Sequence, residues 1–222
     1  MAFNFEVLKE PRGFVKVISF FMAISAFAIA VNSGVNFNIT FKCGGNTSCT
    51  NYSLSYPFKI NDLDAPSCDG ESKKLYGDYS SNSQFFVAVG VIAMLYSMCA
   101  LFLYIYYEDN YANDQRLVKI DFACTCLLII FWFIASIAWA VGVTDIKEYT
   151  DSERIFNEAM VCQHGGCSMT SPAYAGLNVS VVFGFGNVLV WLFTVWFLRK
   201  ETFPPSDDAE QGIISAADGS PM

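Results

Sequence analysis

Residues 85–107 read FFVAVGVIAMLYSMCALFLYIYY, a run of 23 residues without a charge or a proline. As a helix this run is about 34 Å long, enough to cross a hydrocarbon core of roughly 30 Å. A soluble helix of that length would carry a polar face, and this run has none. Tyr104, Tyr106 and Tyr107 gather at its end, where amphipathic rings favour the head-group layer of a membrane. The stretch is therefore expected to span a membrane.

Three further apolar stretches of this kind predict a membrane protein with four spans. The composition agrees, because 54% of the residues are hydrophobic and only 15% are charged, well below a typical soluble domain. The further spans are residues 14–35, 122–143 and 177–198. The remaining segments are an N-terminus (1–13), a first loop (36–84), a short connection (108–121), a second loop (144–176) and an acidic tail (199–222), for which we expect disorder.

The first span has an alternative interpretation as a signal peptide, with Lys9, Arg12 and Lys16 as its basic region. Removal of such a peptide would leave three spans and would place the two large loops on opposite sides. We favour the span, because the apolar run is long for a signal. Lys16 lies just inside it, and its long side chain is expected to reach back to the head groups.

The first loop changes to the period of a β-strand. Apolar and polar residues alternate over residues 37–43 and again over 52–60, on both sides of the turn-rich residues 44–48. This pattern predicts a β-hairpin, whose apolar face needs cover from the second loop or the ends of the helices. The Asp and Ser residues of the segment 77–81 are expected to cap the second long helix.

The loops also indicate which side of the membrane they occupy. Acceptor motifs for N-glycosylation begin at Asn38, Asn46 and Asn51 in the first loop, and five of the eight cysteines lie in the two loops. Both features suit an oxidising, glycosylating lumen, so the termini are expected to be cytosolic. Asn46 and Asn51, on or beside the hairpin turn, are the expected glycosylation sites, whereas Asn38 and Asn178 are expected to lie too close to the membrane.

Few residues point to chemistry. Cys162, His164 and Cys167 could hold a metal, but no fourth ligand lies nearby, and a loop closed by a disulfide is the favoured interpretation. No acidic or basic residue lies deep in a span, and only Lys16 and Asp121 lie near the edges, whereas pumps and carriers usually mark their pathways with such groups. No catalytic constellation appears, so neither an enzyme nor a cofactor is expected. The net charge of −8 argues against nucleic acid.

Small and polar residues in the spans suggest where helices approach closely. Asn187 is expected to bond across to another helix rather than to line a pore. Cys99, Cys124 and Cys126 are expected to be small buried hydrophobes, with palmitoylation of the latter two as a minor alternative. The pairs of small residues spaced by four are Ser136 and Ala140, Ala138 and Gly142, and Ser180 and Gly184.

An ordered set of short segments resembles the synaptophysin family, within the four-span MARVEL group. The set covers roughly residues 7 to 203, and the order of the segments makes it specific. The segments are KEPRGFVKV (9–17), YPF (56–58), APSC (65–68), GDYSS (77–81), LYSM (95–98), AWA (138–140), LNVSVVFGF (177–185) and KET (200–202).

The resemblance implies a multi-pass protein of small cytoplasmic, synaptic-like vesicles that acts in trafficking or regulated exocytosis. It implies binding to the SNARE synaptobrevin and to cholesterol-rich membrane, an association with the vacuolar proton pump, and a possible homo-oligomer. It also implies one disulfide in each loop, Cys43–Cys68 and Cys162–Cys167, and a sugar on Asn46.

The chain departs from the family at two places. Cys49 is an extra cysteine beside the altered segment FKCGGN (41–46), so a local Cys43–Cys49 pair is a rival to Cys43–Cys68. Five loop cysteines cannot all pair within one chain, which leaves one free or bonded to another molecule. The tail lacks the Tyr-Gly-Pro-Gln-rich repeats of neuronal synaptophysin and is closer to pantophysin-like members.

The sequence thus predicts an all-α, four-transmembrane-helix bundle of MARVEL type, with a small disulfide-stabilised luminal cap containing a β-hairpin. Its expected function is non-enzymatic organisation of vesicle membrane and partner proteins. One alternative is an oligomeric channel lined by small and polar residues of the fourth span. Another is a junctional adhesion protein like a claudin or occludin, although the first loop contains no Trp, unlike that of claudins.

Overall fold

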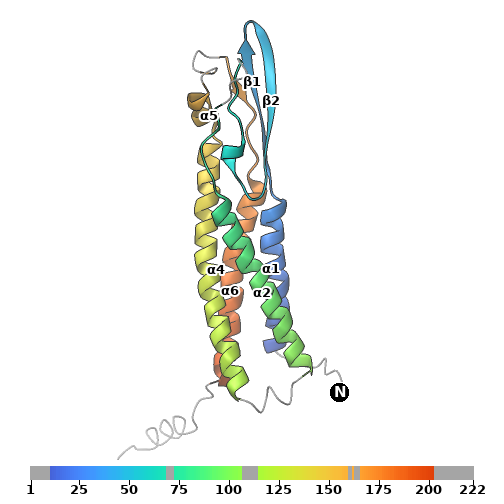
Figure 1. Cartoon of the computed structure of the whole chain (residues 1–222). Coiled ribbons are helices and arrows are strands. Elements are labelled where there is room, and N and C mark those ends of the chain that lie inside the picture. Colours follow the sequence, from blue (N-terminus) through green and yellow to red (C-terminus); the bar gives the residue numbers. More distant parts are fainter. Residues whose placement is uncertain (1–10, 69–72, 107–114, 160–161, 163–165, 203–222) are drawn as a thin grey trace, which may run out of the picture.

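Four long helices run side by side in the computed structural model (Figure 1), which describes residues 11–68, 73–106, 115–159, 162 and 166–202. All four are long and apolar enough to cross a membrane. The four-span prediction is therefore confirmed. The helices are α1 (Pro11–Asn32), α2 (Ser80–Tyr106), α4 (Gln115–Tyr149) and α6 (Ala175–Thr202).

The helices form a closed bundle in which α1 and α4 each pack between α2 and α6. Its interior holds large aromatic side chains, among them Trp132, Trp139 and Trp191, all fully buried. The outward faces expose large apolar side chains such as Phe21 and Val182, at 62% and 69% of their surface. Helices that pack together inside lipid are expected to be apolar both on the faces that contact one another and on the faces that contact lipid.

The helices extend beyond the apolar stretches that identify them. α4 already begins at Gln115, within the expected connection, and it continues to Tyr149 in what was expected to be the second loop. A helix does not need to end at the membrane surface when charged residues such as Lys147 and Glu148 continue it in water. The bundle therefore has a cap end, which carries the β-strands, and a terminal end, where α1 begins and α6 ends (Figure 1).

The predicted hairpin stands above the cap end (Figure 1). Strands β1 (Val35–Cys43) and β2 (Asn46–Leu54) pair antiparallel, with Cys43 opposite Asn46. The two-residue turn is Gly44-Gly45, whose φ angles of 56° and 93° lie in the left-handed region that favours glycine. A short strand of the second loop, β3 (Ser168–Met169), pairs with the other edge of β1, so the sheet order is β2-β1-β3.

The second strand differs from its prediction. β2 begins at Asn46 and ends at Leu54, whereas the sequence pattern suggested residues 52–60. The outer part of β2 is polar and exposed, so it shows no alternation, and its pairing depends on backbone hydrogen bonds. Pro57 has no N–H to continue the ladder, and Phe58 and Ile60 follow in irregular chain and in the 3₁₀ turn η2 (Ile60–Asp62). Both side chains are nevertheless buried.

Aromatic contacts and helix caps join the cap to the bundle. The Phe58 ring packs against Trp139 of α4, with 5.4 Å between centroids. Asp78 accepts a hydrogen bond from the backbone N–H of Ser80, the first residue of α2, over 3.0 Å. Hydrogen bonds from the Ser80 side chain, and to a lesser degree from this N–H, lower the pKa of the Asp78 carboxyl. At the other loop Asp151 caps the helix α5 (Ser152–Glu158) by accepting from the N–H of Glu153.

Two disulfides close the cap, Cys43–Cys68 and Cys162–Cys167. Cys49 is free and exposed, opposite Thr40 in the sheet. The rival pairing of Cys43 with Cys49 is therefore wrong, because β2 carries Cys49 away from the turn. Cys162 and Cys167 are bonded to each other, so neither is available as a thiolate ligand for the metal that the sequence suggested as an alternative. His164 lies outside the described residues.

Replacing Cys68 with Ser should loosen the cap, whereas replacing Cys49 with Ser should leave it unchanged. Closing a loop over the sequence separation of 25 between Cys43 and Cys68 stabilises by about 3.5 kcal/mol on the chain-entropy estimate. The measurement is the rate of limited proteolysis within residues 36–84 of the purified protein. Equal rates for Cys68→Ser and Cys49→Ser would contradict the expectation.

Candidate functional site: a buried ion pair joining the four helices

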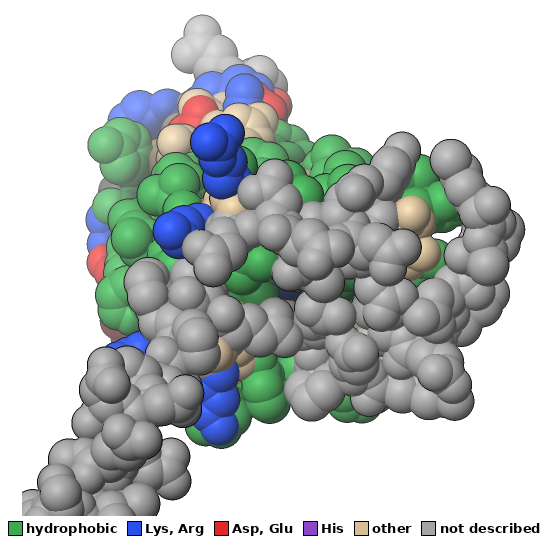
Figure 2. Space-filling model, turned by 90° about the horizontal axis from the view of Figure 1, so that it is seen from below, with side chains coloured by type: hydrophobic (Ala, Val, Ile, Leu, Met, Phe, Trp, Pro, Cys, Tyr) green, Lys and Arg blue, Asp and Glu red, His purple; other side chains and the backbone are tan. Residues whose placement is uncertain are grey.

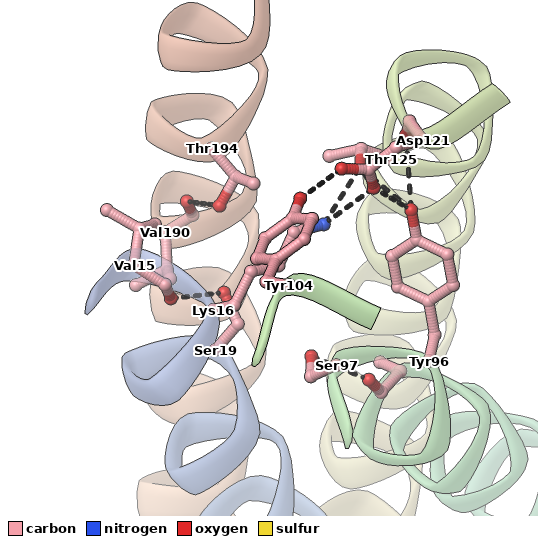
Figure 3. A network of polar contacts seen from close by, with 11 residues as sticks. Val15, Lys16, Ser19, Tyr96, Ser97, Tyr104, Asp121, Thr125, Val190 and Thr194 are labelled. Atoms are coloured by element: carbon pink, nitrogen blue, oxygen red, sulfur yellow. Dashed lines mark hydrogen bonds and ion pairs between the residues drawn. The ribbon is translucent and has the colours of Figure 1, made fainter. Parts of the chain in front are cut away.

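Lys16 of α1 is fully buried and points into the bundle. Its Nζ atom lies 3.0 Å from Oδ1 of Asp121 and 3.3 Å from the hydroxyl oxygen of Thr125, both on α4. The Asp121 side chain is only 9% exposed. The two residues therefore form an ion pair inside the membrane-spanning part of the bundle, near its terminal end (Figure 3).

The Asp121 carboxylate accepts hydrogen bonds from a second helix as well. The hydroxyl of Tyr96 donates to Oδ1 and that of Tyr104 donates to Oδ2, both from α2. Thr125 lies 3.4 Å from Oδ1 on the next turn of α4. Figure 3 shows these side chains converging on the carboxylate from two sides. Asp121 is thus held by an ammonium group and by hydroxyls at both of its oxygens.

The fourth helix contributes an aromatic face. Lys16 Nζ lies 5.4 Å from the ring centroid of Trp191 on α6 and 4.6 Å from that of Tyr96. A cation over an aromatic ring is attracted by the partial negative charge on the face of the ring. We call Lys16, Tyr96, Tyr104, Asp121, Thr125 and Trp191 the ion cluster, and each of the four helices supplies at least one of its members.

Because the ion cluster lies within the membrane-spanning part of the bundle, its charges affect the stability of the helix arrangement. Lipid cannot solvate either charge, so a buried carboxylate or ammonium without its partner is strongly disfavoured. The charged pair becomes tolerable only when the remaining lone pairs and protons are also satisfied, as the tyrosine hydroxyls satisfy the carboxylate here. The cluster therefore favours one arrangement of α1, α2 and α4 over others that separate the charges.

One expectation about these residues is wrong. Lys16 does not reach back to the head groups, because its side chain is fully buried and pairs with Asp121. Both residues lie near the terminal end of the bundle, so their opposite charges are at a similar depth. This similar depth is the feature of the sequence that could have indicated the ion pair. Tyr104 resembled a member of an interfacial belt, but its hydroxyl faces inward.

The predicted packing residues lie at the cap-side half of the bundle. A Cβ atom at Gly184 would lie 2.8 Å from Ser136 Oγ, so α4 and α6 approach closely there. Ser180 accepts a hydrogen bond from the indole N–H of Trp139 over 2.8 Å. Asn187 donates to the backbone oxygen of Met22 in α1 over 3.0 Å.

The α2–α4 contact uses the other predicted pair. Asn82 of α2 donates to the backbone oxygen of Ala138 over 2.9 Å, and Gly142 is buried beside the Asn82 side chain. Ala140 is half-buried, and its backbone oxygen accepts from Thr144 of the same helix.

The predicted glycosylation sites lie on the hairpin. Asn46 is exposed at its tip, beside the glycine turn. Asn51 is exposed too, but it lies directly opposite Asn38 in the sheet rather than beside the turn. The expectation that Asn38 lies closer to the membrane than Asn51 is therefore wrong, because β2 starts at Asn46 and runs back alongside β1. The side chain of Asn178 instead accepts a hydrogen bond from Lys147 over 2.6 Å.

The described residues offer little chemistry besides the ion cluster. No group of three or more His, Cys, Asp or Glu is placed to bind a metal within them. Figure 2 shows the molecule from the terminal end. Most of the coloured surface in this view is apolar, and several Lys and Arg side chains lie among the apolar ones. Arg116, Lys119, Arg199 and Lys200 are exposed in this part of the chain.

These features define an integral membrane protein of four spans with a disulfide-closed cap. The family profile described as the MARVEL membrane-associating domain matches residues 7–197, which include all four spans and the cap. The chain therefore belongs to the MARVEL family.

Neutralising either member of the ion pair alone should destabilise the bundle by about 3–5 kcal/mol, because the other charge is left buried without its partner. Lys16→Met leaves a carboxylate, and Asp121→Asn leaves an ammonium. The double variant should recover most of the loss, since the amide that Asp121→Asn introduces keeps an oxygen that accepts from the tyrosine hydroxyls. The measurement is the midpoint of thermal unfolding in detergent.

The exposed Lys119 provides the matched control. Lys119→Met, also on α4, removes a positive charge that makes no buried pair and should leave the unfolding midpoint unchanged. A double variant as unstable as the sum of the two single variants would show that the two charges are not coupled.

Proposed function

We propose that the chain is a non-enzymatic vesicle-membrane protein that organises membrane and a synaptobrevin-type SNARE in trafficking or regulated exocytosis. The observation that carries the proposal is the MARVEL match over residues 7–197, combined with the ordered synaptophysin-like segments along the same span. MARVEL domains associate with membranes and are generally non-enzymatic. Association with the vacuolar proton pump and with cholesterol-rich membrane belongs to the same proposal.

The synaptophysin-like segments coincide with the interior contacts of the bundle. The segment 9–17 contains Lys16, and 95–98 contains Tyr96, which meet at the same carboxylate. The segment 138–140 contains Trp139, which bonds to Ser180 in the segment 177–185. The resemblance therefore concerns the residues that hold the four helices together, and it supports a common architecture.

Sidedness is also part of the proposal. We place the cap in the lumen and the termini in the cytosol, because two disulfides and the exposed Asn46 all lie in the cap. An oxidising compartment both forms such bonds and supplies the glycans. Localisation to cytoplasmic vesicles rests on the family resemblance.

The alternatives have less support. An oligomeric channel would need the polar residues of α6 on an outward face, but Ser180, Asn187 and Thr194 are buried within the single bundle. An adhesion protein of claudin type would carry a Trp-rich first loop, and residues 36–84 contain no Trp.

Synaptobrevin should co-purify with the full chain from mild detergent, through contacts made mainly between transmembrane segments. Deleting residues 201–222 should leave this association intact, since the tail lies outside the spans. The measurement is the amount of synaptobrevin recovered with each form, compared with an unrelated four-span protein. Recovery no greater than that control would contradict the proposal, and loss on deletion alone would place the contact in the tail.

Asn46→Gln should remove the principal glycan, and the double variant with Asn51→Gln should remove most of what is left, because both side chains are exposed on the proposed luminal cap. The measurement is the gel shift on glycosidase treatment. Asn178→Gln is the control, since its side chain is engaged by Lys147. An unaltered shift in the double variant would contradict both sites, and an absence of glycan in the wild type would speak against the luminal orientation.

A further inference from the structure

Polar atoms without partners gather between α4 and α6 in the middle of the bundle. Among the described residues, the buried side-chain atoms that find no hydrogen-bond partner are Trp132 Nε1, Ser136 Oγ, Asn187 Oδ1 and Trp191 Nε1. All four residues are 0% exposed. Hydrocarbon cannot replace the missing bonds, so such atoms are strongly disfavoured within a membrane unless something polar reaches them.

The register of the two helices brings three of these residues together. The Trp139–Ser180 bond and the contact of Ser136 with Gly184 align α4 and α6 antiparallel. One turn further along both helices, the same register places Trp132 beside Asn187. Trp191 follows one turn later on α6. Ser136 lies one turn closer to the cap, against Gly184, so it is not part of this group.

The chemistry of the three atoms is complementary to one kind of ligand. Two indole N–H groups can only donate and cannot bond to each other. The Asn187 oxygen can only accept, and its amide nitrogen is already used, donating to the backbone oxygens of Met22 and Phe183 over 3.0 and 2.9 Å. Turning the amide over would break both of these bonds, and its NH2 group could not accept from an indole N–H.

We infer that the bundle binds internal water between Trp132, Asn187 and Trp191. A water molecule has two lone pairs for the indole N–H groups and a hydrogen for the amide oxygen, and buried waters commonly make about three such bonds. The Trp191 ring also packs against Tyr96 of the ion cluster, with 5.9 Å between centroids. The water site thus continues the polar interior from the ion cluster toward the middle of the membrane.

The test is NMR of the full chain in lipid nanodiscs with ¹⁵N-labelled tryptophan indoles. The chain has four Trp, which Trp→Phe variants assign one by one. Trp139, whose indole N–H bonds to Ser180, serves as the dry hydrogen-bonded control, and the outward-facing Trp196 serves as the lipid-facing control. We expect the Trp132 and Trp191 signals at hydrogen-bonded shifts with magnetisation transfer from water, and no such transfer to Trp139.

Asn187→Leu should abolish the transfer from water to both indoles, whereas Thr194→Val should not, because the Thr194 hydroxyl bonds only within its own helix. Wild-type Trp132 and Trp191 signals without any transfer from water would overturn the inference, whatever the variants do. Hydrogen-bonded shifts without water transfer would equally overturn it, because they would mean that side chains rearrange to satisfy one another. If Asn187→Leu does not fold, the wild-type measurement decides alone.

Discussion

The structure depends on one electrostatic constraint, the burial of Lys16 and Asp121 within the membrane-spanning part of the bundle. Each charge is tolerable only beside the other, and the carboxylate also needs the hydroxyls of Tyr96 and Tyr104. These groups come from α1, α2 and α4, and the Trp191 ring on α6 closes the remaining side. Apolar packing in lipid distinguishes poorly between alternative arrangements of four apolar helices, because lipid tails are as apolar as the side chains. A buried charge pair does distinguish between them.

The spans and the hairpin could be predicted because each follows from a local pattern. Uncharged runs of membrane length identify the helices, and alternation identifies β1. The ion cluster could not be predicted in this way, since Lys16 and Asp121 are 105 residues apart, and a lysine near a helix end ordinarily reaches water. The position of β2 was misjudged for a related reason. Its outer residues are polar on both faces, so only the backbone ladder with β1 defines the strand.

The cap and the bundle form one continuous core. Phe58 packs on Trp139, and Trp139 in turn packs near Phe86 of α2 and bonds to Ser180 of α6. The part of the cap that follows the hairpin therefore packs on the same aromatic side chains that fill the cap-side half of the bundle. The two disulfides fasten the ends of the loops, while β3 joins the second loop to the first through β1. The cap is therefore fixed to the bundle, and its two loops to each other, at several points.

The length of α4 has a mechanical consequence. Its 35 residues form a rod of about 52 Å, well beyond the roughly 30 Å of hydrocarbon that it crosses. A helix accommodates a change in bilayer thickness mainly by tilting. Because α4 continues unbroken to Tyr149, next to α5, any tilt at the terminal end is carried as a lever motion to the cap. One continuous helix therefore connects the membrane-spanning part of the bundle to the cap, so a movement of α4 at one end also displaces its other end.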